Sequence, residues 1–570
     1  MRNSLYNVKT NYMKKSLFTS FFAALLMHCY TQEFQTVFGS DGIDIATSIV
    51  QFADQSYLVA GYTDGTQNTG TQMYLARLDA MGDTLWTKSM GGFGLDTFED
   101  LALKEDGNVL FTGVSNSLLP SNGNQMIVGE LRENGEILWT REIGSDGDDQ
   151  GRSIYPTADG GYIASGISNS SGLDYSYDMI VVKGFADGSV DWYRSLGTPG
   201  YEAALYALES LEGDIFVYGH CNTDNTQGYD LNICKLSASG TFTWSKTLGA
   251  FDNELAWDMT LLPDGDILFC GDTNSNDDGL NDGFLIRMQT NGQILWSKTY
   301  GMQFSDHFTS VQYLDNDMIA IAGLTASIGN GGLDVMAMFI NTEGYLKYAH
   351  SYGGENKDMA IDVTKTFDGG LALIGNTRSW GQGFNSCYLV KTNIDGNAAC
   401  NQNTSDQFIV KNFDIAVTEN QFMVRTEAGN ISTVDFILTS KSGSLVDLLC
   451  REGHVDPQFN PNIGNNNSDD DTADDETLGL EFYGNSSGDV QFKLFPNPST
   501  GFVQATIEKD NRQEGKIRVT NLTGVLKWEK DIGQGSTAQI DMDLSFLSSG
   551  VYFVQLEFDN KLLTQRLILQ

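Results

Sequence analysis

Hydrophobic and polar residues alternate along most of this chain in short runs that are separated by turns. Between residues 242 and 301, "FTWSKTLG" is followed by "AWDMTLLPDGD", "DILFCGDT" and "GFLIRMQTNG", and then by "LWSKTYG". Asp-Gly and Asn-Gly pairs stand at the turns, as at 264–265 and 291–292. Such pairs are typical of hairpins because they accept positive φ at little cost. The pattern predicts short antiparallel strands.

One aromatic position shows that these strands repeat. Trp86, Trp139, Trp192, Trp244, Trp296, Tyr348 and Cys400 follow one another at spacings of 52 or 53 residues, and Phe34 lies one step earlier. Four strands in each of seven repeats predict an all-β fold, with a seven-bladed β-propeller over residues 32–400. A β-solenoid is the alternative, but its coils are usually about half this length. We expect 33–39 to complete the seventh blade and the repeated Trp to pack between blades, with cofactor docking as its other interpretation.

An acidic residue stands five positions after the glycine that recurs in each repeat. The seven acids are Asp44, Asp96, Asp149, Glu202, Glu254, Asp306 and Asp358. They form either a ring of carboxylates able to hold a cation, or a set of acids that each accept backbone N–H bonds at the entry to their own strand. A structural role should recur in every repeat, whereas a binding site usually breaks the symmetry. The structural interpretation is therefore favoured.

Charge narrows the choice of partners. The chain has 34 Lys and Arg against 74 Asp and Glu, a formal net charge of −40. Such a surface repels phosphate backbones and anionic lipids, so no nucleic acid is expected as a partner. Asp277, Asp278 and Asp282, in and beside an acid-rich loop, are candidate Ca²⁺ ligands, and a solvated loop is the alternative. No other metal or cofactor is predicted.

We expect the chain to be exported, on the evidence of its N-terminal residues given below. Its cysteines can then form disulfides, because the exterior of the cell is oxidising. Cys221 and Cys234 flank one hairpin loop, and Cys400 and Cys450 bracket residues 401–450. We expect both pairs to be joined and Cys270 to be a buried free thiol. The rival partner of Cys400 is Cys387, on an adjacent strand of the last hairpin.

The export signal is residues 1–31. Lys14 and Lys15 precede an apolar run that ends at Met27, and small residues precede a cut at Gln32. This is the layout of a signal peptide; a lipoprotein site at Cys29 is the alternative. No later apolar run is long enough for a transmembrane segment. After the propeller we expect a β extension packed on it at 401–455, and an acidic disordered linker at 456–490.

Strand patterns return at 491–570 and predict a small β-sandwich. Its motif residues are Phe495, Pro496, Asn497, Pro498, Gly501, Gly550, Tyr552, Lys561 and Arg566. These residues resemble the type A C-terminal sorting domain of the Bacteroidota type IX secretion system, with Phe495 in place of the usual Tyr. The resemblance implies Sec export, passage through the type IX machinery and removal of the domain by a sortase-like protease. The protein would then be secreted or held on the outer-membrane surface.

No catalytic signature accompanies these features. The chain has no His-Glu-x-x-His, no Gly-x-Ser-x-Gly and no phosphate-binding glycine loop. The propeller also resembles uncharacterised repeat propellers of type IX substrates, which implies no activity. We expect a binding or adhesion protein whose propeller takes a glycan or protein ligand, and not an enzyme. The alternative is an extracellular hydrolase that acts on polysaccharides or other glycans, with paired acids on separate blades.

Overall fold

The computed structural model describes residues 33–455 and 491–569, apart from short segments between strands. Those segments are 41, 65–69, 93, 118–122, 145–146, 171–176, 199, 223–227, 276–279, 330, 382–384, 421–422, 426–429, 434–438, 441–444, 452–453, 496–501, 509–514, 522–525, 533–536, 548–549 and 559–560. The expected signal peptide and linker therefore lie outside the described residues. Every regular element in the described part is a β-strand, and none of it forms a helix long and apolar enough to cross a membrane. The chain divides into two units, Met1–Asp471 and Thr472–Gln570.

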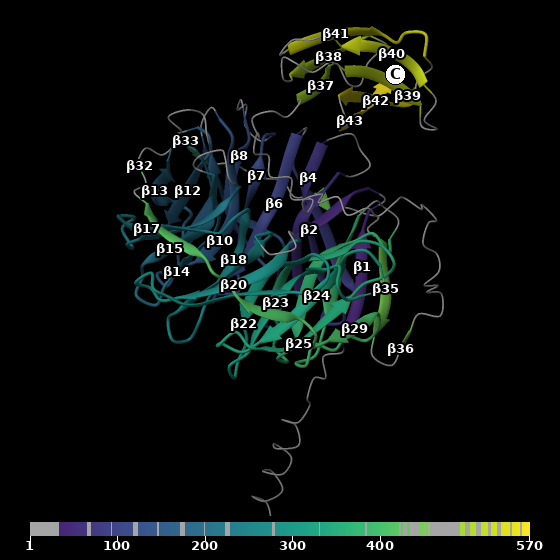
Figure 1. Ribbon diagram of the computed structural model, residues 1–570. Helices are drawn as coiled ribbons and strands as arrows, with labels where there is room; N and C mark the ends of the chain where they lie inside the picture. The colour runs from purple at the N-terminus through teal and green to yellow at the C-terminus, as the bar shows by residue number, and fades with distance from the viewer. Residues whose placement is uncertain are drawn as a thin grey trace, which may run out of the picture. The chain divides into compact units, whose positions relative to one another are not determined.

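Seven sets of four antiparallel strands form most of the described first unit (Figure 1). Their first strands are β2 (Asp44–Gln51), β6 (Gly94–Leu103), β10 (Asp149–Pro156), β14 (Tyr201–Glu209), β18 (Glu254–Leu261), β22 (Asp306–Tyr313) and β26 (Asp358–Lys365). The second strands are β3 (Tyr57–Thr63), β7 (Val109–Ser115), β11 (Tyr162–Ser168), β15 (Ile215–Asn222), β19 (Ile267–Thr273), β23 (Ile319–Thr325) and β27 (Leu371–Thr377). The third strands are β4 (Gly70–Leu78), β8 (Gln125–Leu131), β12 (Asp178–Gly184), β16 (Asp230–Leu236), β20 (Asp282–Met288), β24 (Asp334–Ile340) and β28 (Ser386–Lys391). The fourth strands are β5 (Thr84–Met90), β9 (Ile137–Gly144), β13 (Val190–Gly197), β17 (Phe242–Gly249), β21 (Ile294–Gly301), β25 (Leu346–Tyr352) and, in the last set, β1 (Phe34–Gly39). The first two sets are joined by a short parallel pairing of β4 with β6.

Burial explains the sequence of each strand. The second and third strands lie in the middle of each sheet, between the first and the fourth strand. Every residue of β7 and β24 is buried. They are therefore rich in apolar residues, whereas β9 begins with partly exposed and exposed positions and ends with buried ones. The tight turns need glycine, because Gly107 and Gly265 have φ of 85° and 90°.

The repeated tryptophans pack against the next sheet, as the sequence predicts. Trp192 Nε1–H donates to the Ala238 carbonyl at 3.1 Å, and Trp296 Nε1–H donates to the Thr342 carbonyl at 3.2 Å. Both carbonyls belong to the turn between the third and fourth strands of the following sheet. At the first of these turns a Cβ on Gly240 would lie 2.7 Å from the Trp192 ring. The aromatic residue thus fixes the spacing between neighbouring sheets.

The first strand of the chain belongs to the last sheet. β1 pairs antiparallel with β28, with Phe34 opposite Lys391 and Phe38 opposite Cys387. The seven first strands contact one another in chain order, and β26 also contacts β2. Ile49 N–H donates to Asp362 Oδ2 at 3.0 Å across that last junction. The first strand of the last sheet is therefore in contact with that of the first sheet.

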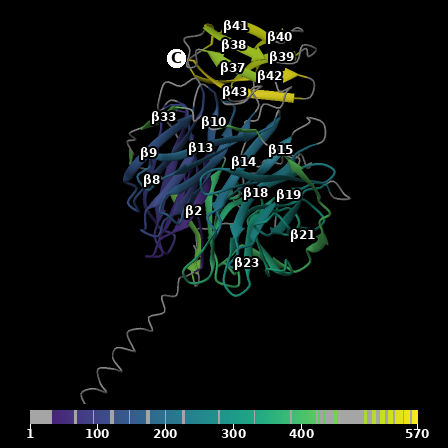
Figure 2. The same ribbon diagram turned by 90° about the vertical axis from the view of Figure 1, so that its left-hand side faces the viewer.

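Short strands in residues 402–451 extend the sheets outward (Figures 1 and 2). They are β29 (Gln402–Ser405), β30 (Ile409–Asn412), β31 (Ala416–Asn420), β32 (Met423–Arg425), β33 (Asn430–Thr433), β34 (Thr439–Ser440) and β35 (Leu445–Arg451). Each pairs with the fourth strand of a different sheet, in the order β25, β21, β17, β13, β9, β5 and β1. A last strand, β36 (His454–Val455), pairs with β35.

The cysteines pair once in the described residues. Cys400 and Cys450 form a disulfide, whereas Cys270 and Cys387 are buried thiols. The expected Cys221–Cys234 pair is wrong, because both are buried free thiols. The hairpin register places Cys221 opposite Asp230 and Cys234 opposite Val217. Cys234 Sγ instead contacts Asn232 Oδ1 at 3.7 Å.

The second unit has two antiparallel sheets. Its strands are β37 (Gln491–Phe495), β38 (Phe502–Glu508), β39 (Gly515–Asn521), β40 (Leu526–Ile532), β41 (Thr537–Asp543), β42 (Gly550–Phe558) and β43 (Lys561–Leu569). The strand orders are β37-β38-β41 and β40-β39-β42-β43. Val503, Ile517, Met542 and Val554 are among the residues of its apolar core.

A prediction follows from the glycine that stands at the end of each fourth strand or directly after it. A Cβ on Gly301 would lie 1.8 Å from Oδ1 of the buried Asp282 on the neighbouring strand. Gly301→Ala should therefore lower the free energy of unfolding by about 1–3 kcal/mol, measured by denaturant titration. Gly332→Ala is the control, because a Cβ there meets nothing within 4 Å. Equal stability of the two variants would contradict this account.

Candidate functional site

The seven repeat acids are turned into their own sheets. Each is at most 1% exposed. Asp306 shows their typical contacts: it accepts hydrogen bonds from the Thr325 and Ser327 hydroxyls and from Met302 N–H at 3.0 Å. Burial raises the pKa of Asp306 to about 6. These contacts join the entry loop of a sheet to the end of its second strand, so the carboxylate is satisfied locally.

A second set of polar residues, here called the inner ring, stands four positions after the repeat acids. Its members are Ser48, Asp100, Ser153, Tyr206, Asp258, Ser310 and Asp362. In every first strand a β-bulge ends at this position. The bulge re-aims the side chain toward the next sheet. Ile154 N–H thus donates to Asp100 at 2.9 Å, and Val311 N–H donates to Asp258 at 2.9 Å.

The inner ring holds protons. Ser48 Oγ lies 3.1 Å from Asp100 Oδ1 and 3.0 Å from Asp362 Oδ2. Ser310 Oγ lies 2.9 Å from Asp258 Oδ2 and 3.1 Å from Asp362 Oδ1. Four oxygen–oxygen contacts share two serine protons, so full hydrogen bonding needs two more from carboxyl groups. Burial accordingly raises the pKa of Asp100 to about 8 and that of Asp258 to about 7.

An asymmetric cluster lies at the end of the sheets where first and third strands begin. It consists of Tyr177, Tyr201, His220 and Tyr229, and is called here the tyrosine cluster. The Tyr201 ring lies 6.0 Å from that of Tyr177, 5.7 Å from that of Tyr229 and 6.2 Å from that of His220. Tyr201 and Tyr229 are partly exposed. Burial lowers the pKa of His220 to about 4, so its ring is neutral at pH 7.

Charged and aromatic groups flank the tyrosine cluster. Asp272 Oδ2 lies 3.3 Å from His307 Nδ1, and Asp272 Oδ1 accepts the indole N–H of Trp257. Burial has the largest effect on the pKa of His220; the negative charge of Asp272 offsets part of it, and the positive charge of Arg152 adds to it. Arg152 donates to Glu99 at 3.1 Å. Two acids, two imidazoles, a guanidinium and four large aromatic rings therefore occupy neighbouring positions in adjacent sheets.

These residues come from fixed positions in the repeat that sequence reasoning passed over. Glu99, Arg152 and Trp257 stand at the bulge, three residues after the repeat acid, where the other sheets have Thr47, Leu205, Thr309 and Ile361. His220 and Asp272 share one position near the end of the second strand, where the others have Tyr62, Val114, Ile167, Leu324 and Asn376. A comparison of the seven repeats position by position would have marked both, because a binding site breaks the symmetry that structural residues keep.

The remaining predicted site residues do not form one site. Asp277 and Asp278 lie outside the described residues, while Asp282 is buried beside Gly301. Within the described residues, no group of three or more His, Cys, Asp or Glu side chains could hold a metal ion. Pro496, Asn497, Pro498 and Gly501 also lie outside them. Gly550 and Lys561 begin β42 and β43, Tyr552 is buried, and Arg566 is opposite Phe553.

The sequence of the second unit matches a known domain family. Residues 493–570 match the secretion system C-terminal sorting domain, which confirms the resemblance seen in the sequence. This domain is the address read by type IX secretion, so the protein is exported to the cell surface or the medium. No curated protein matches the chain.

Solved structures resemble the chain only distantly. The GH93 alpha-L-arabinofuranosidase of Fusarium graminearum with arabinobiose is 9% identical, covers 64% of this chain and 98% of its own, and has a TM-score of 0.36. The plexin A4 extracellular region is 9% identical over 92% and 75%, with a TM-score of 0.40. PorZ, a surface component of the type IX secretion system of Porphyromonas gingivalis, is 12% identical over 92% and 81%, with a TM-score of 0.22. At this identity the similarity concerns the architecture of β-sheets and not the activities of these proteins.

Protons on the inner ring predict a pH dependence. Asp100 and Asp258 have folded pKa values above the unfolded value near 4, so they stabilise the fold at low pH. That stability should be lost as the pH rises through about 8. Denaturant titrations from pH 5 to 9 should show it, and Asp100→Asn should reduce the slope by up to about 1.4 kcal/mol per pH unit.

The control for this prediction is Glu212→Gln, in an exposed turn. The wild-type curve also contains the opposite trend of His220: its pKa is lowered by burial from 6.5 to about 4, so the fold loses stability as the pH falls below about 6.5. The difference between variant and wild type is therefore the quantity to measure. The same slope in Asp100→Asn, Glu212→Gln and wild type would show that Asp100 retains no proton.

Proposed function

We propose that the first unit is a closed seven-bladed β-propeller that binds a glycan or protein ligand at the tyrosine cluster, on the cell surface or after release. Closure is supported by the place of β1 in the last sheet and by the contact of β26 with β2. A closed ring leaves no first or last sheet without a neighbour, as in other propellers. The sorting domain supplies the route out of the cell and the contact with the type IX machinery.

The main support for this binding site is that its residues differ from those at the same positions of the other repeats. Tyr201 stands directly before a repeat acid, where the other sheets have Ile43, Leu95, Asp148, Asn253, Ser305 and Lys357. Such a residue is not needed for the fold, because six sheets form without it. Phe251 and Phe304, 95% and 50% exposed, lie on entry loops at the same end of the next two sheets. Exposed aromatic side chains beside polar groups mark interaction sites.

Chemistry favours a neutral glycan among the ligands considered. Sugars present apolar C–H faces and polar edges, which match tyrosine and tryptophan rings that carry hydrogen-bonding groups. Glu99 and Asp272 can accept from hydroxyl groups, and Arg152 can donate to them. The net charge of −40 disfavours polyanionic ligands.

A hydrolase is the second candidate. Glu99 and Asp272 come from different sheets and flank one cluster, as the two carboxyl groups of a glycosidase do. Both are engaged, Glu99 with Arg152 and Asp272 with His307 and Trp257. Mass spectrometry of glycans after incubation tests this candidate: products that disappear in Asp272→Asn and Glu99→Gln would make the protein an enzyme.

Removal of the central ring of the cluster should weaken binding. Tyr201→Ala should lower the affinity for a glycan identified on an array by at least about tenfold, because a well-packed aromatic anchor contributes about 2 kcal/mol or more to binding. Affinity is measured by calorimetry with that glycan. Tyr345→Ala is the control, since Tyr345 is 65% exposed in a turn at the other end of the sheets. Equal affinity in both variants would place the ligand elsewhere.

Passage from the periplasm to the outside of the cell should depend on the second unit. A chain that ends at residue 456 should fold with unchanged stability and accumulate in the periplasm of a type IX-competent host, because the two units are separate. Lys561→Glu with Arg566→Glu should do the same if the last strand is read by the machinery. Cell fractionation and immunoblotting measure the outcome. Surface display of the truncated chain would refute the role of the domain, and full-length chains in the medium would refute its removal.

A further inference from the structure

The strands β29 to β35 visit every sheet of the first unit once. The chain leaves the last sheet after β28, reaches β25 of the preceding sheet with β29, and then moves backward sheet by sheet to β5. β35 finally pairs with β1, in the sheet from which the chain started. The first five of these strands begin at 402, 409, 416, 423 and 430, a step of seven residues per sheet. The described strands β29 to β35 therefore follow the whole outer edge of the proposed ring.

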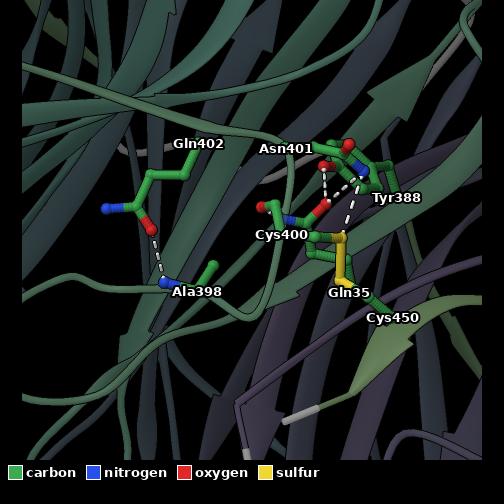
Figure 3. The surroundings of a disulfide bond; sticks show 7 residues. All are labelled: Gln35, Tyr388, Ala398, Cys400, Asn401, Gln402 and Cys450. Carbon is green, nitrogen blue, oxygen red and sulfur yellow. Dashed lines mark hydrogen bonds between the residues drawn. A yellow bond between two sulfur atoms is a disulfide. The ribbon is translucent and has the colours of Figure 1, made fainter. Parts of the chain in front are cut away.

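The two ends of this segment are joined to each other. Cys400 and Cys450, 50 residues apart, form the disulfide (Figure 3). Gln35 of β1 lies at this junction: it is opposite Cys450, and its side-chain amide donates to the Cys400 carbonyl. Asn401 and Tyr388 donate to Gln35 Oε1 at 3.3 and 2.8 Å. The N-terminal strand is thus held between the last sheet and the end of the segment.

We propose that the Cys400–Cys450 disulfide makes residues 400–450 a covalent belt around all seven sheets. Formation of this bond from two thiols after export locks the ring. This inference rests on ring closure as stated under the proposed function. Formation of the bond removes two electrons and two protons from the thiols. The electrons reduce the disulfide of an exported dithiol–disulfide oxidoreductase, which leaves as its dithiol. The oxidising exterior keeps the bond formed.

The belt needs its ends tied, because some of its strands are weakly held by themselves. β30 is exposed along its length, and β34 has only two residues. Single apolar anchors do reach inward: Phe408 joins the cluster that contains Tyr300, and Leu449 joins the one that contains Val37. Without the disulfide the segment can detach from either end, one short strand at a time. With the disulfide, detachment of one strand leaves both ends in place.

The residue next to the disulfide also contacts the first sheet. Arg451, directly after Cys450, donates to the Met81 carbonyl at 2.7 Å and to Asp83 at 3.0 Å. Both belong to the turn between β4 and β5 of the first sheet, whereas β35 itself extends the last sheet. The belt therefore also spans the junction between the last and first sheets, which the chain itself crosses between β1 and β2.

Hydrogen exchange and unfolding kinetics of the full chain test the belt. Reduction of the wild type under native conditions should raise amide exchange throughout 402–433 and accelerate unfolding in denaturant at least tenfold. The variant Cys400→Ser/Cys450→Ser should behave like the reduced protein and not respond to reductant. If that variant does not fold, the reduced wild type still gives both measurements. The buried thiols Cys270 and Cys387 are present in both proteins and serve as the internal control.

Two results would overturn the belt. Exchange that rises only at 392–402 and 445–451 would make the disulfide a local link, and an unchanged unfolding rate would deny that it locks the ring. Failure of the proposed function has other signs. Rapid exchange of β2 and β26 in the oxidised protein would refute ring closure, and an unchanged glycan affinity of Tyr201→Ala would refute the tyrosine cluster as the binding site without bearing on the belt.

Discussion

Every sheet in the first unit presents a backbone edge at its fourth strand, and the rest of the structure depends on how that edge is covered. An exposed edge of N–H and C=O groups invites pairing with other chains. Seven such edges occur in one unit. Six of them are paired by β29 to β34, and the seventh, formed by β1, is paired by β35. One segment of about fifty residues thus covers the edge of every sheet.

The first strands face a different constraint, because each one contacts the first strands of the neighbouring sheets. Main-chain groups at the bulges cannot pair within their own sheet. The inner ring supplies acceptors instead, as Asp362 does for Ile49 N–H across the last junction. Where carboxyl groups face one another through Ser48 and Ser310, hydrogen bonding requires retained protons. The centre and the edge therefore solve the same problem, the satisfaction of backbone groups, by different means.

The proposed binding site consists of departures from the repeat. The bulge that aims Ser48 and Asp100 at neighbouring sheets also presents Glu99, Arg152 and Trp257 beside it. Substitutions at these positions leave the strand pairing intact, since the neighbours are held by backbone bonds and by the tryptophan contacts. The proposed binding site, the belt and the sorting domain can thus vary with little effect on one another.

The sequence by itself determined the features that repeat or act locally. The 52-residue spacing of Trp86 to Trp296 predicted the sheets, and the motif at Gly550 with the basic last strand indicated the sorting domain that residues 493–570 match. Strand periodicity and turn chemistry depend on neighbours in the chain, so they are visible without a fold. Only the tertiary structure decided the contacts between distant residues: the register that separates Cys221 from Cys234, the proximity of Asp100 to Asp362, and the assembly of Tyr201 with His220. The path of 402–451 was decided in the same way, because each short strand is defined by the edge it meets and carries little pattern of its own.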